Sequence, residues 1–89
     1  MSTISLQVYG KVQGVYYRAS TRDQALALGL TGWVRNMPDG TVLLHASGTV
    51  AQLKALEAWC KKGPRGAEVS KLVKMELPEQ EFENFIVVR

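Results

Sequence analysis

The chain has 89 residues, of which 46% are hydrophobic and 21% are charged, and its formal net charge is +3. This length suits one hydrophobic core, so we expect residues 1–89 to form a single domain, and the composition excludes a disordered chain. No run approaches the ~18 apolar residues that a membrane-spanning helix needs. The N-terminal residues alternate between polar and apolar instead of resembling a secretory signal, which favours the cytoplasm.

Basic residues are scattered along the sequence, which gives little support for nucleic-acid binding. The one adjacent pair, Lys61 and Lys62, falls at the end of a predicted helix, where positive charge suits the helix dipole. The single Cys60 cannot form an intramolecular disulfide. Because it lies on the apolar side of a helical pattern, we expect a buried thiol and not a nucleophile.

The first elements in chain order are a strand and a helix. Residues 3–9 alternate between polar and apolar, which is typical of a strand. After a glycine turn, residues 18–28 have a helical pattern, with a loose capping box of Ser20 and Asp23 near its start. Gly29 then takes the usual place of a glycine that ends a helix.

A hairpin, a second helix and two further strands follow. Residues 31–37 and 41–46 are predicted strands joined by a Pro-Asp-Gly turn. Residues 50–61 are a predicted helix that ends at a Gly-Pro pair. Its apolar positions recur at helical spacing, at Val50, Leu53, Leu56 and Cys60. The last predicted strands are residues 69–77 and 82–88.

The order strand–helix–strand–strand–helix–strand, with a short extra C-terminal strand, predicts an α+β fold. The simplest packing is an antiparallel sheet with both helices on one face, which is the ferredoxin-like α/β sandwich of βαββαβ topology. This architecture also occurs in RNA-binding modules and metal chaperones, so the fold alone does not settle the function.

Residues 10–18, "GKVQGVYYR", combine a glycine turn with an arginine at the start of a helix. Gly14 can adopt a positive φ without penalty, and alternating left- and right-handed backbone there aims successive N–H groups into an anion-binding hollow. The helix N-terminus adds unpaired N–H groups, and the guanidinium of Arg18 can hold two phosphate oxygens. On glycine spacing alone, however, a loop-shaping role for the glycines and a surface position for Arg18 are the plainer interpretation.

Together with "GLTGWVRNMPDGTV" at 29–42 and "KGPRGAEV" at 62–69, this stretch resembles the acylphosphatases, small enzymes that hydrolyse carboxyl–phosphate anhydrides. The resemblance runs almost from end to end, with the motifs in the family's order. It implies an enzyme that hydrolyses small acyl phosphates without a metal ion or cofactor. Inorganic phosphate, or sulfate as its mimic, would bind as product, and no nucleic acid or membrane partner is implied.

The resemblance also assigns the site residues. It places the catalytic arginine at Arg18 and the catalytic asparagine at Asn36, where the carboxamide would orient the attacking water. The phosphate-binding loop would act mainly through backbone N–H groups and comprises Gln13, Gly14, Val15, Tyr16, Tyr17 and Arg18. Tyr17 stands where many members carry Phe, so its hydroxyl needs water or a carbonyl within reach. Without the resemblance, we would interpret Asn36 as a strand-end amide that caps the following turn.

The implied chemistry needs no general acid, because an acyl phosphate leaves as a weakly basic carboxylate. The transition state of phosphoryl transfer is loose, so positioning and electrostatic stabilisation supply most of the catalysis. A neutral carboxamide cannot remove the proton of the attacking water. The resemblance supports transfer of that proton to a phosphate oxygen of the substrate.

The other chemistry-bearing residues have plainer interpretations. The only histidine, His45, lies in a strand pattern on the face of Leu43 and is expected on the sheet surface. Trp33 and Trp59 are expected to pack in the core or on the sheet. Four glutamates predict a solvated turn and no metal site: Glu76, Glu79, Glu81 and Glu83.

Two alternatives to an enzyme stay open. One is an RNA-binding module on the same fold, although Tyr16 and Tyr17 are adjacent and precede a helix instead of lying in a central strand. The other is a phosphate-sensing domain that keeps the anion site without turnover. No sequence feature points to an obligate interface, so a monomer is expected.

Overall fold

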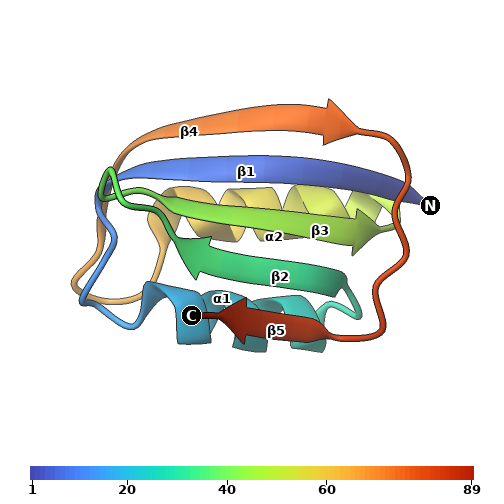
Figure 1. Ribbon diagram of the computed structural model, residues 1–89, viewed down its shortest axis with the longest axis horizontal. Helices are drawn as coiled ribbons and strands as arrows, with labels where there is room; N and C mark the ends of the chain where they lie inside the picture. The colour runs from blue at the N-terminus through green and yellow to red at the C-terminus, as the bar shows by residue number, and fades with distance from the viewer.

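The computed structural model describes residues 1–89 as a five-stranded sheet with two helices on one face (Figure 1). The elements in chain order are β1 (Ser2–Lys11), α1 (Tyr17–Ala27), β2 (Thr31–Asn36), β3 (Val42–Gly48), α2 (Val50–Lys62), β4 (Glu68–Leu77) and β5 (Phe85–Val88). Across the sheet the strands run in the order β4-β1-β3-β2-β5. This arrangement confirms the predicted ferredoxin-like α+β fold.

Four of the strands pair as predicted, and the fifth makes the sheet mixed. β1 is antiparallel to β3 and β4, and β2 is antiparallel to β3, whereas β5 pairs parallel with β2. The chain leaves β4 at one end of the sheet, crosses that end and returns along the opposite edge (Figure 1). This crossing gives β5 the direction of β2, so both strands end on the same side of the molecule.

β5 starts at Phe85, later than predicted, because residues 78–84 cross the end of the sheet. Gln80 anchors this crossing segment. Its N–H donates to Oγ1 of Thr3 at 2.9 Å, and its carbonyl oxygen accepts from Oγ of Ser47 at 2.8 Å. The C-terminal strand is therefore fixed in place by hydroxyl groups on β1 and β3.

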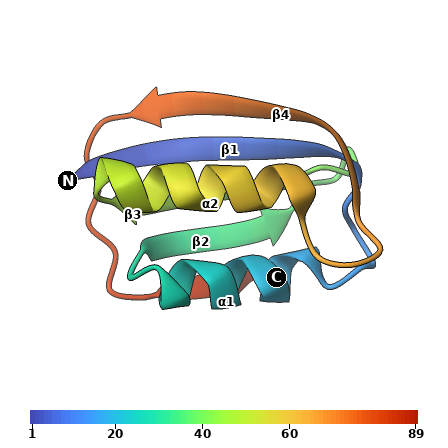
Figure 2. The same cartoon turned by 180° about the vertical axis from the view of Figure 1, so that it is seen from behind.

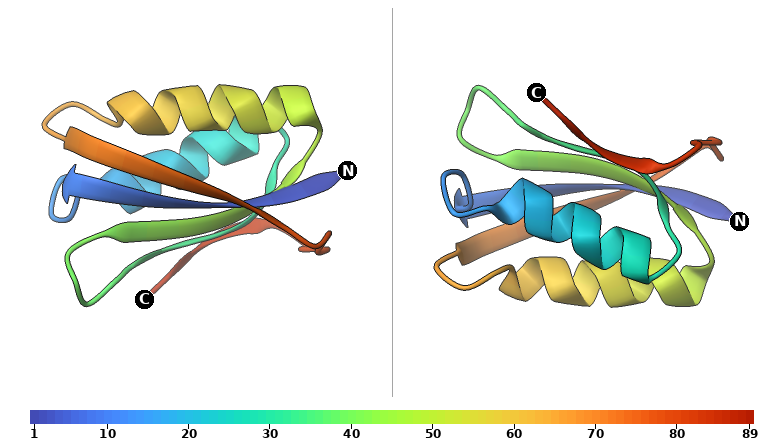
Figure 3. Two further views of the ribbon diagram at one scale, coloured as in Figure 1. Left: turned by 90° about the horizontal axis from the view of Figure 1, so that it is seen from above. Right: turned by 90° about the horizontal axis from the view of Figure 1, so that it is seen from below.

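The hydrophobic core lies between the sheet and the two helices, which cover the same face in both the rear view and the edge views (Figures 2 and 3). It is one cluster of Ile4, Leu6, Val8, Val12, Tyr17, Ala25, Leu30, Val34, Val42, Leu44, Ala46, Leu53, Leu56, Cys60 and Phe85. The predicted apolar stripe of α2 is confirmed at its three later positions. Val50 is 58% exposed and does not extend this buried stripe, because it is the first residue of α2 and follows the exposed Thr49.

The two helices begin in different ways. The N-cap of α1 is Tyr16, which makes no side-chain capping bond. The predicted capping box of Ser20 and Asp23 is wrong, because α1 starts earlier and both residues lie inside it. The complete capping box is instead at α2, where Thr49 and Gln52 exchange hydrogen bonds of 3.2 and 2.9 Å. The first turn of α1 is thus left without a side-chain cap.

Candidate active site

The backbone between β1 and α1 turns at two left-handed positions. φ is 76° at Gly14 and 60° at Tyr16, while Val15 between them has no positive φ. Alternation of left- and right-handed residues is the geometry of a backbone nest, which gathers N–H groups around an anion. Tyr16 is the one non-glycine residue of the chain with positive φ, a conformation that costs about 1–3 kcal/mol and is concentrated at functional sites. We refer to residues 13–18 as the nest.

The N–H groups of this segment are free of internal partners. No backbone N–H from Gln13 to Ala19 donates to a backbone carbonyl, and no side chain caps α1. The first N–H groups of a helix lack intrahelical acceptors, and the positive end of the helix dipole lies at the same place. The segment therefore offers a concentrated set of donors suited to an anion.

Two side chains of the nest contact neighbouring parts of the fold and hold the loop in place. Nε2 of Gln13 donates to the carbonyl oxygens of Met37 and Thr41, both at 2.9 Å. These bonds connect the nest to the turn that follows Asn36. The side chain of Val15 packs against the core. Of the predicted loop residues, these two do not line the cleft described below.

Tyr17 fixes the start of α1 from inside the core. Its side chain is 1% exposed, and its hydroxyl donates to the carbonyl oxygen of Cys60 at 2.6 Å. Burial, and then the neighbouring Cys60, raise the pKa of the Tyr17 hydroxyl well above its usual range, so it remains a donor. The carbonyl partner meets the requirement predicted for a tyrosine in place of phenylalanine. Burial also raises the pKa of the Cys60 thiol to about 12, in line with the predicted inert thiol.

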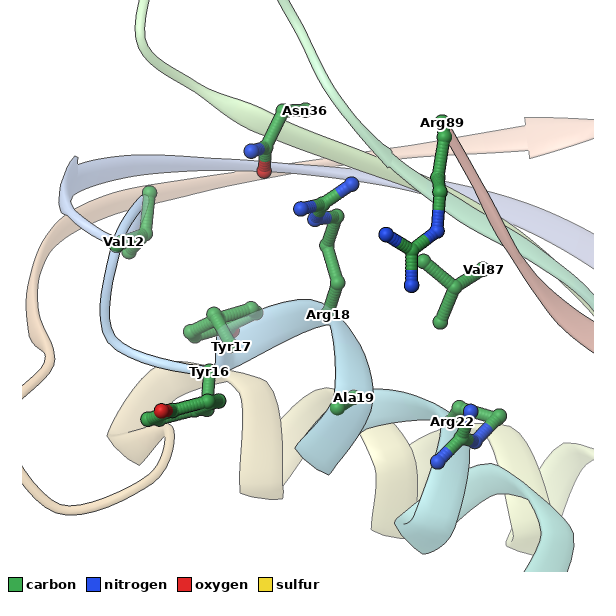
Figure 4. Close-up of a pocket in the computed structure, with 10 residues that line it drawn as sticks. Val12, Tyr16, Tyr17, Arg18, Ala19, Arg22, Asn36, Val87 and Arg89 are labelled. Atoms are coloured by element: carbon green, nitrogen blue, oxygen red, sulfur yellow. The ribbon is translucent and has the colours of Figure 1, made fainter.

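Arg18 from α1 and Asn36 from the end of β2 face the same cleft, which has a volume of about 460 Å³ (Figure 4). The residues that line it are Val12, Gly14, Tyr16, Tyr17, Arg18, Ala19, Arg22, Asn36, Val87 and Arg89. In Figure 4 the guanidinium of Arg18 extends from α1 toward the carboxamide of Asn36. Two residues far apart in sequence are thus brought together across the cleft.

The carboxamide of Asn36 has an unusual feature, because its Oδ1 is buried and has no hydrogen-bond partner. Leaving a buried acceptor unpaired costs about 1–3 kcal/mol, and native proteins keep few such groups. Asn36 follows Val34 on the helix-covered side of β2, as the strand alternation predicts, whereas Arg35 is exposed on the other side. Oδ1 of Asn36 is therefore available to a donor that enters the cleft.

The cleft is strongly positive. Arg18 and Arg89 take part in none of the ion pairs of the chain, and Arg22 pairs with the exposed Asp23 at 3.2 Å. No Asp, Glu, His or Cys side chain is among the lining residues. Neither Arg22 nor Arg89 was predicted from the sequence as a site residue. The spacing of Arg22, four residues after Arg18, could have indicated a shared helix face, but no local signal reveals Arg89.

The remaining chemistry-bearing residues lie elsewhere. His45 stacks on Trp33 on the open face of the sheet, with ring centroids 4.3 Å apart, and burial lowers the pKa of its imidazole. This confirms the predicted sheet-surface histidine. No group of three His, Cys, Asp or Glu residues is placed to hold a metal ion. None of the helices has the length and apolar character to cross a membrane.

A small α+β domain with a positive cleft built on a helix N-terminus is suited to binding a small anion. The acylphosphatase family model matches residues 4–87. An acylphosphatase of Marinobacter nauticus is 59% identical over 81 residues, which is 90% of this chain and 88% of that relative. The chain therefore belongs to the acylphosphatase family.

Solved structures agree with this assignment. An acylphosphatase from Coxiella burnetii has a TM-score of 0.95 and 39% identity, over 98% of this chain and 92% of its own. The acylphosphatase from Bacillus subtilis has a TM-score of 0.96 and 30% identity, over the full length of both chains. The resemblance seen in the sequence motifs thus extends to the whole fold.

Proposed function

We propose that this chain is an acylphosphatase that hydrolyses the carboxyl–phosphate bond of small acyl phosphates to a carboxylate and inorganic phosphate. Membership of the family and the names of the relatives support this activity. The observation that favours it most within the molecule is the meeting of three features in one cleft. These are the unpartnered N–H groups of the nest, the guanidinium of Arg18 and the unpaired Oδ1 of Asn36.

The phosphoryl group of the substrate is held by the nest and Arg18. The backbone N–H groups donate to its oxygens, and the dipole of α1 favours its negative charge. The planar guanidinium of Arg18 adds paired, charge-assisted hydrogen bonds. Because Arg18 has no ion pair to break, its full charge is available as negative charge spreads over the oxygens in the transition state.

Asn36 positions the attacking water. The water donates one hydrogen to Oδ1 of Asn36, the acceptor that has no partner within the chain, and its oxygen then faces the phosphorus. Orientation of this kind can supply a large part of a rate enhancement, because it removes the entropy of bringing the reactants together. The carboxamide is neutral and therefore serves as a positioning group and not as a base.

The reaction balances without a charged acid or base from the protein. The bond between the water oxygen and phosphorus forms as the bond between phosphorus and the acyl oxygen breaks, and the carboxylate leaves with the electron pair. The proton of the water passes to a phosphate oxygen. Because the carboxylate is a weak base, no donor is required at the leaving group, and we propose that no metal ion or cofactor takes part.

Hydrolysis of benzoyl phosphate by the purified chain tests this function. We expect turnover that is unchanged when a chelator is present in excess. Loss of activity with chelator would contradict the metal-free mechanism. A folded protein that releases no phosphate from benzoyl phosphate or acetyl phosphate would contradict the acylphosphatase proposal itself.

Binding without turnover would instead identify a phosphate-sensing domain, an alternative that the names of the relatives do not favour. Titration of inorganic phosphate alongside the activity assay separates the two. The RNA-binding alternative is also less favoured, because Tyr16 and Tyr17 lie in the nest and the aromatic Trp33 on the open sheet face is stacked on His45.

We also propose that the chain acts as a monomer in the cytoplasm, without a nucleic-acid or membrane partner. A lone buried thiol at Cys60 suits a reducing compartment. Light scattering during size-exclusion chromatography tests the oligomeric state, and a concentration-independent mass of about one chain is expected. Salt-sensitive binding to RNA or to anionic vesicles at micromolar protein would contradict the partner assignment.

A further inference from the structure

We infer that Arg22 and Arg89 form a second anion-binding subsite of the cleft. The preferred substrates are then acyl phosphates whose acyl group ends in a carboxylate. This inference rests on the proposed function, because it assigns the phosphoryl group to the nest and Arg18. The second subsite binds the carboxylate at the other end of the same substrate molecule.

The fold places the two arginines beside Arg18 by different routes. Arg22 lies four residues after Arg18 on α1, so the two side chains occupy neighbouring positions on one helix face. Arg89 follows β5, and the parallel pairing of β5 with β2 brings it to the same side of the molecule as Asn36. In Figure 4 both side chains lie on the side of Arg18 away from Val12.

The charges of the cleft exceed what one phosphoryl group neutralises. Three guanidinium groups line the cleft, and none of the other lining side chains is an Asp or a Glu. The one counter-charge to Arg22 is Asp23, whose side chain is 70% exposed and lies outside the lining. Like charges four residues apart destabilise a helix, so this arrangement is unfavourable unless an anion binds. A phosphoryl dianion at Arg18 leaves Arg22 and Arg89 available for a second negative group.

The size and lining of the cleft also suit such a substrate. Its volume of about 460 Å³ falls within the range of roughly 300–1,000 Å³ typical of small-molecule sites, which leaves room for an acyl chain beside the phosphoryl group. Ala19 and Val87 are aliphatic residues of the lining, and they lie next to Arg18 and two residues before Arg89 in the sequence. They provide contacts for methylene groups between the two charged ends of a dicarboxylic acid monophosphate.

Two substrates of equal chain length test the inference. Succinoyl phosphate carries a terminal carboxylate where butanoyl phosphate carries a methyl group. We expect kcat/KM to be about tenfold higher for succinoyl phosphate at low ionic strength, with a smaller ratio at high salt because exposed charges are screened. Arg22→Gln and Arg89→Gln should each lower this ratio by about threefold. Arg35→Gln, which removes the same charge from the open sheet face, should leave the ratio unchanged.

Equal kcat/KM values for the two substrates would overturn the inference, as would a ratio that Arg35→Gln lowers as much as Arg22→Gln does. Binding of non-hydrolysable phosphonates distinguishes this failure from failure of the proposed function. If 4-oxo-5-phosphonopentanoate binds more tightly than 2-oxopentylphosphonate and Arg89→Gln reduces this difference while Arg35→Gln does not, the subsite is supported even if no substrate turns over. If both phosphonates bind equally while butanoyl phosphate is hydrolysed, the function stands and the subsite is wrong.

Discussion

The hydroxyl of Tyr17 donates a hydrogen bond of 2.6 Å to the carbonyl oxygen of Cys60. This bond joins the first turn of α1 to the last turn of α2. Backbone carbonyl groups in the last turn of a helix have no N–H donor within that helix. Because Tyr17 directly precedes Arg18, its side chain also fixes the end of the nest against the core. The hydroxyl therefore contributes mainly to the packing of the two helices, while the buried ring of Tyr17 holds the end of the nest in place.

Tyr17→Phe should lower the free energy of unfolding by about 1–3 kcal/mol, because the buried Cys60 carbonyl loses its donor. The ring and its packing remain, so turnover should change little. Denaturant unfolding of the variant gives the measurement. Tyr16→Phe is the matched control, since Tyr16 is 85% exposed and its change should stay within about 0.5 kcal/mol. Equal stability of the Tyr17 variant and the wild type would contradict a structural role for the hydroxyl.

Arg18→Ala should reduce kcat/KM for benzoyl phosphate by roughly thirty- to several-thousandfold, which corresponds to roughly 2–5 kcal/mol. The loss follows from removal of a charge-assisted contact to the phosphoryl group. Arg18→Lys keeps the charge without the planar fork and should recover only part of the activity. Arg35→Ala, on the open sheet face, is the control. Near wild-type turnover of the alanine variant would exclude Arg18 from the mechanism.

Asn36→Ala should lower kcat on the order of a hundredfold through misplacement of the attacking water, while the inhibition constant of inorganic phosphate stays close to that of the wild type. The free energy of unfolding of this variant should stay close to that of the wild type, because Oδ1 of Asn36 has no hydrogen bond to lose. Asn84→Ala provides a control at an exposed asparagine. A variant with weak phosphate binding and normal kcat would reverse the predicted pattern and assign Asn36 to binding.

Acid should destabilise the fold through His45. Burial lowers the pKa of His45 below its ordinary value of 6.5, so the unfolded chain takes up a proton before the folded chain does. The contribution of neutral His45 to the free energy of unfolding is present above pH 6.5. It is lost as the pH falls through that value toward the lower pKa of His45 in the folded chain. Because His45 is the only histidine, His45→Gln should flatten the fall in denaturant midpoint between about pH 7.5 and 5.5. An equal fall in both proteins would contradict this origin.

Local patterns in the sequence were sufficient for much of the fold, whereas Arg18 and Asn36 were assigned to the site only through the family resemblance. Strand alternation accounts for the position of Asn36 on the same side of β2 as the buried Val34, and the glycine motif located the left-handed turn at Gly14. The motifs also located Arg18 at the start of a helix. These features depend on residues close together in the chain, which is why sequence alone could predict them.

Features set by distant contacts could not be predicted in this way. The direction of β5 depends on the crossing of residues 78–84, which Gln80 anchors to Thr3 and Ser47. That direction in turn brings Arg89 into the cleft. The N-cap of α1 was also missed, because Tyr16 adopts a left-handed conformation that side-chain preferences for helix caps do not predict.

The central claim is that the nest and Arg18 bind the phosphoryl group, and titration of the isotope-labelled chain with inorganic phosphate in NMR tests it most directly. We expect saturable shifts centred on the backbone N–H signals from Gly14 to Ala19 and on the side-chain amide of Asn36, with all of them weakened in Arg18→Ala. Shifts centred on another basic region, such as Lys61 and Lys62 at the end of α2, or none at millimolar phosphate, would contradict the account.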